Sequence, residues 1–296
     1  MPTTPPPCLP SGVRLTESPN ALQILEITSP AASGLIHVQG AHLTHWQPTG
    51  AEPVLFVSRQ SYFTKGKAIR GGVPVCFPWF ANRAGHPESP AHGFVRATDW
   101  TLASVTSENG DSISARFTFQ DSESTRIHWP HTFRAEYSIT IGPRLEMNFE
   151  VENRGSEPLT YEAALHTYFK VSDARNVGIT GLEGAEYLDK VDSNTRKRLG
   201  NEPLRFTAET DLVFVNTKST VRLVDPGFNR TIVVEKSGSG TTVVWNPWTV
   251  KAKGMADFGD NEWPDMACIE TANSGENSVT LSPGQKHSMS ARIRLE

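Results

Sequence analysis

The sequence predicts an all-β fold, a large antiparallel sandwich built as a single domain. Apolar and polar residues alternate with a period of two through most of the chain, and helical periodicity is nearly absent. Turn-forming residues, 23 glycines and 21 prolines among 296 residues, punctuate the chain at short intervals. A chain of this length can fold as one all-β domain and bury a sizeable core.

The first elements follow a proline-rich start. Residues 1–19 lack the cationic beginning and apolar core of a secretory signal, so we interpret them as a loose leader before one domain over 20–296. Three short strands are expected next, over 22–28, 34–39 and 42–46. The third contains His42 and His45, which a strand directs to opposite faces, so the pair is not expected to share a metal ion.

The strongest alternation lies in the middle of the chain. Apolar residues recur at every second position over 113–119 and 135–141, and again over 145–151 after Gly142-Pro143. This pattern predicts antiparallel strands, the last two joined as a hairpin, with one buried face and one face in water. Further strands are expected over 220–224, 231–236, 241–246 and 289–295. The polar segment 190–203 is predicted to be an exposed loop.

The composition excludes several classes of protein. The formal net charge of -4 is small and the charges are mixed, which argues against a nucleic-acid partner. No apolar run approaches the roughly 20 residues that span a bilayer. The three cysteines, Cys8, Cys76 and Cys268, are odd in number and scattered, so we expect no disulfide framework and a cytoplasmic protein. The sequence has no phosphate-cradling glycine loop, nucleophile elbow or closely spaced Cys/His cluster.

One irregular stretch gathers candidate ligand-binding residues. Residues 69–80 read Ile-Arg-Gly-Gly-Val-Pro-Val-Cys-Phe-Pro-Trp-Phe, and residues 92–96 read His-Gly-Phe-Val-Arg. The prolines and adjacent glycines suit neither a helix nor a regular strand, and the apolar residues suggest backbone packed beside a cleft. Arg70 and Arg96 stand at the two ends with His92 nearby, and a guanidinium can bind phosphate bidentately. We interpret the stretch as one wall of an anion-binding site; the alternative is a core segment with surface arginines.

A second candidate is His166, in the strand-like segment 159–169. Alternation places the apolar residues of this segment on one face and Ala164, His166 and Tyr168 on the other. A histidine and a tyrosine beside the gap left by an alanine would suit the floor of a sugar site. The alternative is a structural histidine satisfied by a hydrogen bond.

Two carboxylates are the remaining candidates. Glu270 follows the apolar, strand-like segment 265–269, where burial would raise its pKa toward the range useful for a general base. The alternative is a glutamate at a sheet edge with a local partner. Asp189 follows Tyr187-Leu188 and could accept hydrogen bonds from sugar hydroxyls, or it could be an ordinary turn residue.

Seven segments of the chain, taken in sequence order, resemble the motifs of the hexose-6-phosphate mutarotases (glucose-6-phosphate 1-epimerases), a branch of the aldose 1-epimerase superfamily. The shared segments are IRGG, a Pro-aromatic run, HGF-x-R, His-Thr-Tyr-Phe, Tyr-Leu-Asp, Trp-Asn-Pro and Cys-Ile-Glu-Thr-Ala-Asn. The likeness extends from about residue 20 to the end of the chain. Two departures are Ala81, where the family usually has glycine, and Val95, where alanine is common. Neither removes a functional group.

The resemblance implies a fold, an activity and a set of site residues. The implied fold is the galactose-mutarotase-type β-supersandwich, and the implied activity interconverts the α and β anomers of a hexose 6-phosphate without a metal or cofactor. His166 is implied as the general acid and Glu270 as the general base. The implied ligand-binding residues are Arg70 and Arg96 for the phosphate, and His92 and Asp189 for the sugar. We expect a monomer whose partner is the phosphorylated hexose.

Three other functions stay open at this point. A mutarotase for free aldoses would share His166 and Glu270 but would lack the phosphate-binding arginines. A non-catalytic carbohydrate-binding sandwich would keep the aromatic residues and would not need the acid/base pair. A glycoside hydrolase usually needs two carboxylates across the scissile bond, and a histidine fits poorly as the partner.

Overall fold

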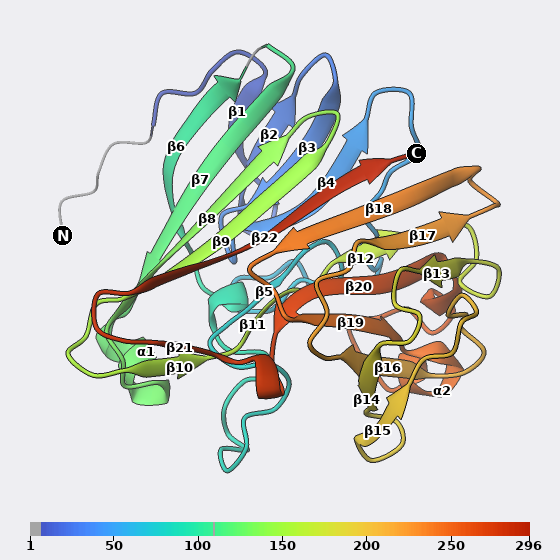
Figure 1. The fold of residues 1–296 in the computed structure, drawn as a ribbon. Coiled ribbons are helices and arrows are strands. Elements are labelled where there is room, and N and C mark those ends of the chain that lie inside the picture. Colours follow the sequence, from blue (N-terminus) through green and yellow to red (C-terminus); the bar gives the residue numbers. More distant parts are fainter. Residues whose placement is uncertain (1–6, 109) are drawn as a thin grey trace.

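The computed structural model describes residues 7–108 and 110–296, and their strands form antiparallel sheets (Figure 1). This confirms the all-β class. The helical elements are short: α1 (Glu123–His128), α2 (Trp248–Lys253), η1 (Val95–Ala97), η2 (Trp263–Asp265) and η3 (Gly275–Asn277). Within the described ranges, no helix has the length and apolarity needed to cross a membrane.

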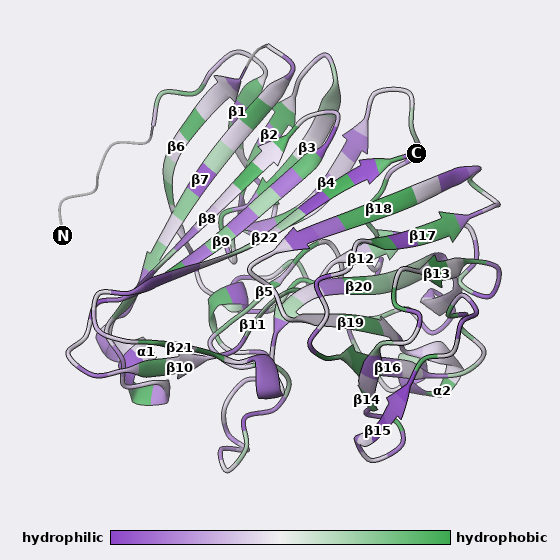
Figure 2. Ribbon diagram, viewed as in Figure 1, coloured by the Kyte–Doolittle hydropathy of each residue, from purple (hydrophilic) through white to green (hydrophobic). Residues whose placement is uncertain are grey.

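The longest strands build an eight-stranded sheet with the order β13-β17-β18-β22-β9-β8-β7-β6. Their bounds are β6 (Thr101–Glu108), β7 (Ser112–Gln120), β8 (Phe133–Ile141), β9 (Leu145–Asn153), β13 (Gly178–Thr180), β17 (Val221–Asp225), β18 (Arg230–Ser237) and β22 (Lys286–Leu295). Buried side chains alternate with more exposed ones along β8 and β9, and Figure 2 shows this alternation as green and purple bands. The predicted hairpin is confirmed, since Ile141 pairs with Leu145 across Gly142-Pro143.

A four-stranded sheet packs against one half of this sheet (Figure 1). Its strands are β1 (Val13–Glu17), β2 (Gln23–Thr28), β3 (Ala32–His37) and β4 (His42–Pro48). The buried Trp46 ties the two sheets together, because its Nε1 donates a hydrogen bond to Gly142 O at 3.1 Å. Strand β1 corrects the expectation of a loose leader over 1–19: Val13 is buried and pairs with Ile27. Residues 1–6 lie outside the described part of the chain.

The second large sheet has the order β15-β14-β16-β19-β20-β11-β5, and β12 also pairs with β20. Its strands are β5 (Val75–Cys76), β11 (Ala163–Leu165), β12 (Tyr168–Lys170), β14 (Glu186–Asp189), β15 (Thr195–Arg198), β16 (Thr210–Phe214), β19 (Thr241–Asn246) and β20 (Met266–Asn273). A separate pair consists of β10 (Leu159–Tyr161) and β21 (Val279–Leu281). The segment 190–203 is largely exposed as predicted, but it contains β15, which is purple throughout in Figure 2.

The second sheet is buried on both faces at its centre, where β19 and β20 lie. Leu212, Val244 and Ile269 are neighbours across β16, β19 and β20 and belong to the main core. Successive side chains of a strand point to opposite faces. Asp211 on β16 and Glu270 on β20 therefore point to the face opposite this core.

The two histidines of β4 have separate environments. His42 is fully buried, with Nε2 lying 2.7 Å from Gly71 O. His45 is half-buried, with Nε2 lying 3.2 Å from Ser33 Oγ. Each ring therefore has its own hydrogen-bond partner.

Candidate active site

A cavity of about 280 Å³ opens on the face of the second large sheet that points away from the main core. Strands β16, β19 and β20 form the floor of this cavity. Their register brings its residues together, because Val243 pairs with Glu270 and Asp211 pairs with Trp245. The lining residues are Arg70, Phe80, Ala81, His92, His166, Tyr168, Lys190, Asp211, Val243, Trp245, Lys251, Met255 and Glu270. Four of the six site residues expected from the sequence are among them.

Four other cavities are larger; two of them, of about 310 and 360 Å³, have no histidine among the described residues of their lining, and the two largest, of about 480 and 680 Å³, lie against β9, β18 and β22 and beside α1. Neither of them brings a buried histidine against a buried carboxylate. Because acid/base chemistry needs such groups within reach of one another, the smaller cavity is the better candidate for an active site.

His166 and Glu270 meet in this cavity. His166 lies between β11 and β12, and its Nε2 is 3.3 Å from Glu270 Oε1; the side chains are 8% and 1% exposed. The His166 ring stacks on Tyr168 at a centroid distance of 4.8 Å and an interplanar angle of 12°. Within the described chain, His166 Nδ1 and Glu270 Oε2 have no hydrogen-bond partner. The structure thus joins the two residues and leaves each with a spare polar atom.

Burial disfavours charge on both members of this pair. Burial lowers the pKa of His166 to about 3, and the positive charge of Arg70 contributes. Burial also raises the pKa of Glu270 well above its usual value; Asp211 adds to this shift and Lys190 opposes it. Burial therefore favours the neutral form of the pair, with the shared proton on Glu270, and opposes the ion pair that forms when this proton moves to His166. Such a pair is suited to giving and taking protons.

His92 forms part of the wall beside His166. The two ring centroids are 5.6 Å apart, and His92 Nδ1 accepts a hydrogen bond from the Ala81 N–H at 3.2 Å. Burial, with the positive charge of Arg96, holds the pKa of His92 well below its usual value, so the ring is neutral. A neutral ring whose Nδ1 is an acceptor carries its proton on Nε2. His92 is therefore a hydrogen-bond donor through Nε2.

Ala81, which stands where the resembled family usually has glycine, adopts a glycine-like backbone conformation. Its φ is 59°, in the left-handed region that costs an L-residue about 1–2 kcal/mol. Its carbonyl accepts a hydrogen bond from His92 N at 2.7 Å, and His92 also has a positive φ, of 64°. The alanine thus follows the backbone path that a glycine would take, and the contact with His92 is kept.

Arg70 reaches the cavity and is held by two neighbours. Its Nη1 donates to the Tyr168 hydroxyl at 3.1 Å, and its Nη2 pairs with Asp257 Oδ2 at 3.1 Å. Burial opposes its charge, but Tyr168 and Asp257 outweigh burial and hold the pKa of Arg70 above its usual value. A permanent cation therefore stands on the cavity wall.

Arg96 does not line the cavity, in contrast to the expectation from the sequence. Its Nη2 donates to Ala91 O at 2.7 Å, so the guanidinium contacts the backbone that leads into His92. The turn η1, which contains Arg96, buries Val95 and so fixes the direction in which the neighbouring side chains leave the backbone.

Asp189 lies outside the cavity because its side chain points to the opposite face of the sheet. It pairs with Leu212 of β16, a core residue, whereas the cavity-facing residue of β16 is Asp211. The carboxylate of Asp189 pairs with Lys197 Nζ at 2.8 Å and accepts a hydrogen bond from the Val191 N–H at 3.1 Å. Asp189 therefore caps the turn that carries its neighbour Lys190, and the aspartate that lines the cavity is Asp211.

Sequence analysis missed three charged residues of the lining, Asp211, Lys190 and Lys251. Lys190 follows Asp189 directly, so the Tyr-Leu-Asp motif ends one residue before a residue that lines the cavity. Burial raises the pKa of Asp211, and the charge of Lys190 opposes that rise. Asp211 had no signal in the sequence, because β16 is mostly buried and lacks alternation of apolar and polar residues.

Glu162 connects two segments at the rim of the cavity, one containing Phe80 and the other containing Gly275. Its Oε2 accepts a hydrogen bond from the Phe80 N–H at 2.9 Å, and its Oε1 accepts one from the Gly275 N–H at 2.6 Å. The Phe80 ring lies edge-on to that of His92, with centroids 5.0 Å apart. One carboxylate therefore connects η3 to the segment that supports His92.

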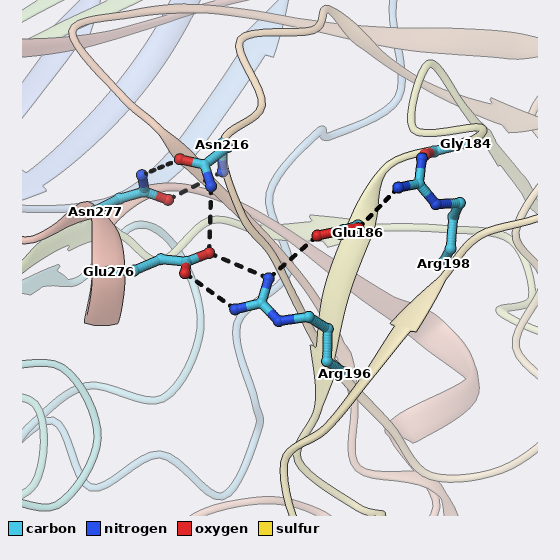
Figure 3. A network of polar contacts seen from close by, with 7 residues as sticks. All are labelled: Gly184, Glu186, Arg196, Arg198, Asn216, Glu276 and Asn277. Carbon is cyan, nitrogen blue, oxygen red and sulfur yellow. Dashed lines mark hydrogen bonds and ion pairs between the residues drawn. The ribbon is translucent and has the colours of Figure 1, made fainter.

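A polar network extends this rim on the surface (Figure 3). Arg196 of β15 lies between Glu276 of η3, at 3.0 Å, and Glu186 of β14, at 3.3 Å. Asn277 of η3 donates to Asn216 at 2.8 Å. The β14–β15 hairpin, which leads into the turn bearing Lys190, is thus connected to η3 through exposed contacts.

One set of side chains in the described ranges, His166, Cys268 and Glu270, has potential metal-ligand atoms within 4.8 Å of one another. Thiolate is the form of cysteine that binds metals. Burial raises the pKa of Cys268 well above its usual value, and the neighbouring Glu270 adds to this shift. The thiol is therefore neutral near pH 7 in this site, and a metal ion bound here would have to displace its proton.

Comparisons with known proteins match most of the chain. A family model described as Aldose 1-epimerase matches residues 23–294. A protein of Escherichia coli (strain K12), provisionally named glucose-6-phosphate 1-epimerase, is 36% identical over 266 residues, which cover 90% of this chain and 88% of that protein. A protein of Cenchrus ciliaris with the same name is 34% identical over 259 residues, covering 85% of this chain and 78% of that protein.

Solved structures agree with the fold. The crystal structure of a provisionally assigned mutarotase from Salmonella typhimurium matches with a TM-score of 0.91 at 30% identity, and the match covers 98% of this chain and 95% of that one. A galactose mutarotase-like protein from Lactobacillus casei matches with a TM-score of 0.71, covering 92% of this chain and 100% of that one. At 16% identity the second match bears on the fold alone. The expected galactose-mutarotase-type fold is confirmed.

Proposed function

The chain belongs to the aldose 1-epimerase family, and on this premise we propose that it interconverts the α and β anomers of a hexose 6-phosphate, with glucose 6-phosphate as the first candidate. The observation that carries the proposal is the 3.3 Å contact of His166 with Glu270 in a cavity that also presents Arg70. The family supplies the class of reaction. The cationic Arg70 and the names of the relatives favour a phosphorylated substrate.

The mechanism is a pair of coupled proton transfers. In the reactive form the proton shared by the pair is on His166 and Glu270 is a carboxylate. Glu270 then takes the proton of the anomeric hydroxyl while His166 gives its proton to the ring oxygen, and the bond between C1 and that oxygen breaks. The open sugar has a carbonyl at C1, which rotates about the C1–C2 bond. Closure from the other side of the carbonyl reverses both transfers and restores Glu270 and His166 to their starting states. The product is the other anomer, and neither oxidation nor a covalent enzyme intermediate is involved.

Other lining residues hold the sugar in register. Arg70 binds the phosphate, which is remote from the reacting carbon, so its binding energy holds the anomeric carbon against the His166–Glu270 pair. His92 donates from Nε2 to a sugar oxygen, and Asp211 accepts from a hydroxyl. Arg96, which the sequence suggested as a second phosphate ligand, supports the backbone before His92 through Ala91.

The competing functions make different demands on the site. A mutarotase for free aldoses does not need a buried, charged Arg70. A non-catalytic sugar-binding protein has no use for a histidine and a carboxylate with raised pKa in direct contact. Measuring anomer exchange with glucose 6-phosphate and with glucose distinguishes both alternatives from the proposal.

Magnetisation-exchange NMR of the two anomers tests the proposed function. With enzyme added, the exchange rate between the anomers of glucose 6-phosphate should rise well above the spontaneous rate, and glucose at equal concentration should respond far less. Faster exchange of glucose than of its phosphate would favour the free-aldose reading. Absence of catalysis with either sugar would favour a binding protein. A cytoplasmic location and a monomeric state remain predictions from the sequence.

A further inference from the structure

Arg70, the proposed phosphate-binding residue, already has an anionic partner. Asp257 Oδ2 lies 3.1 Å from Arg70 Nη2, and the two side chains are 17% and 23% exposed. The hydroxyl of Tyr168 takes the other terminal nitrogen, Nη1, at 3.1 Å. A phosphate that binds the guanidinium of Arg70 would therefore lie close to the carboxylate of Asp257.

Asp257 is held in place by the loop that carries it. This loop joins α2 to η2, and the next residue, Phe258, is buried in an apolar cluster. The loop is fastened by the buried carboxylate of Glu262, which accepts hydrogen bonds from Ser58 Oγ at 2.6 Å and from the Gly259 N–H at 3.1 Å. Asp257 is therefore a fixed negative charge, and a bound anion has to share Arg70 with it.

A second cation of the cavity lining is also paired with a carboxylate. The lining contains three cations, Arg70, Lys190 and Lys251. Lys251 also has a carboxylate partner, Glu209, at 2.8 Å. Two of the three lining cations are thus balanced by acidic residues that are not themselves part of the lining.

We propose that Asp257 is a built-in counter-charge that limits how tightly Arg70 holds the phosphate of the substrate. This inference rests on the proposed function, because it takes a phosphosugar as the ligand. A dianion that contacts Arg70 lies within a few ångströms of Asp257, and like charges at such distances in a partly buried site repel strongly. Uniformly tight binding of both anomers would not raise the rate of ring opening and would slow release. A fixed acid next to the phosphate-binding residue avoids that outcome.

The inference predicts a gain of affinity when an acidic residue is removed from the site. Asp257→Asn keeps the size of the side chain and an oxygen that can accept from Arg70, but removes the charge. Calorimetric titration with inorganic phosphate and with glucose 6-phosphate should give Kd values at least about tenfold lower than in the wild-type protein. KM for glucose 6-phosphate should fall with Kd, and the weak binding of glucose should not change.

A matched control is Glu209→Gln, which removes the partner of the other balanced cation. Lys251 and Glu209 are 41% and 31% exposed, so solvent screens their charges more and the gain in phosphate affinity should stay below about threefold. Asp257→Ser provides a second variant of smaller size in case the asparagine disturbs the loop, and it should also bind phosphate more tightly.

The result that overturns the inference is unchanged or weaker phosphate binding in folded Asp257→Asn and Asp257→Ser. Weaker binding would mean that Asp257 orients Arg70, and unchanged binding would mean that its charge is screened. These outcomes are read from phosphate titration and do not depend on turnover. Failure of the proposed function is seen separately, as absence of anomer exchange in the wild-type protein.

Discussion

His166 Nε2 and Glu270 Oε1 lie 3.3 Å apart, although the two residues are far apart in the sequence. The contact follows from the pairing of β12 and β11 with β20, which places the junction bearing His166 beside Glu270. Each group lies where burial favours its uncharged form, so the proton of the contact is on Glu270 at rest and its transfer to His166 forms a buried ion pair. The anomeric hydroxyl and the ring oxygen of a sugar are both bonded to C1, so two neighbouring side chains can reach both of them.

The first prediction is that His166 and Glu270 act as one unit. His166→Ala and Glu270→Gln should each lower kcat for anomer exchange by about 10²-fold or more. The double variant should be little slower than either single variant, because the second change removes a partner that no longer functions. NMR exchange rates with glucose 6-phosphate measure all three variants. Near-normal turnover in Glu270→Gln would remove Glu270 from the proposed mechanism.

The second prediction concerns pH and Lys190. The groups around Glu270 are His166, Tyr168, Asp211 and Lys190, and among these Lys190 is the one whose charge lowers the pKa of Glu270. Without Lys190 the pKa of the base should rise further, so the acid limb of the kcat/KM profile should move to higher pH. Lys190→Met should therefore lose activity at pH 6–7, within the ordinary working range of a general base, and recover it at more alkaline pH.

Lys190→Arg is the control for this shift, because it keeps the positive charge and should keep the wild-type acid limb. A loss of activity in Lys190→Met that is equal at every pH would indicate a role in binding or folding and would contradict the electrostatic assignment.

The third prediction compares the half-buried Glu162 with the exposed network of the rim. Glu162→Ala removes the acceptor of two backbone N–H groups, from Phe80 and Gly275, and should lower the free energy of unfolding by roughly 1–3 kcal/mol. KM for the phosphosugar should also rise, since the Phe80 segment supports His92. Urea denaturation and steady-state kinetics measure the two effects.

Arg196→Ala is the matched variant in the exposed network of Figure 3. It breaks contacts to Glu186 and Glu276, but surface ion pairs contribute only about 0–1 kcal/mol. Its unfolding free energy and KM should stay close to wild type. An Arg196→Ala effect as large as that of Glu162→Ala would show that the surface network, and not the Glu162 carboxylate, holds the rim.

The fourth prediction is that turnover needs no divalent metal. The clustered ligand atoms of His166, Cys268 and Glu270 include a thiol that burial keeps neutral, and the proposed reaction consists of proton transfers. Prolonged dialysis against a strong chelator should leave kcat unchanged. A loss that is restored by Zn²⁺, and that is absent in Cys268→Ser, would place a metal at this cluster and overturn the prediction.

Alternation in the sequence was enough to predict the class of fold and the outer strands. Strands β8 and β9 have one face in the core and one more exposed face, so burial leaves a period of two in the sequence. The central strands β19 and β20 are buried on both faces, because the core covers one side and the cavity residues cover the other. Two-sided burial removes the period, and for this reason Asp211 on the neighbouring β16 was not found.

Other parts of the site depend on contacts that no local pattern encodes. Asp189 and Lys190 are adjacent, and only the pairing of β14 with β16 determines which of them reaches the cavity. Arg70 and Asp257 are far apart in the sequence, and only the fold brings them into contact. The sequence places Arg96 in the HGF-x-R motif, but only the structure shows that its guanidinium donates to the carbonyl of Ala91.

The last prediction tests how phosphate is recognised. A charge-assisted hydrogen bond contributes about 1.5–3 kcal/mol, so Arg70→Ala should lower kcat/KM for glucose 6-phosphate by about tenfold to a hundredfold. The weak activity on glucose should change little, because that sugar has no group for Arg70 to bind. Arg70→Lys should recover only part of the loss, since an ammonium lacks the planar fork that fits phosphate.

Arg96→Ala gives the contrasting result in the same assay. Arg96 acts on the site through Ala91 and His92, which serve both sugars, so its loss should lower kcat/KM for glucose 6-phosphate and for glucose by similar factors. A selective loss on the phosphosugar in Arg96→Ala would mean that its guanidinium turns to the phosphate when substrate binds. An equal loss on both sugars in Arg70→Ala would make Arg70 structural and favour a free aldose as the substrate.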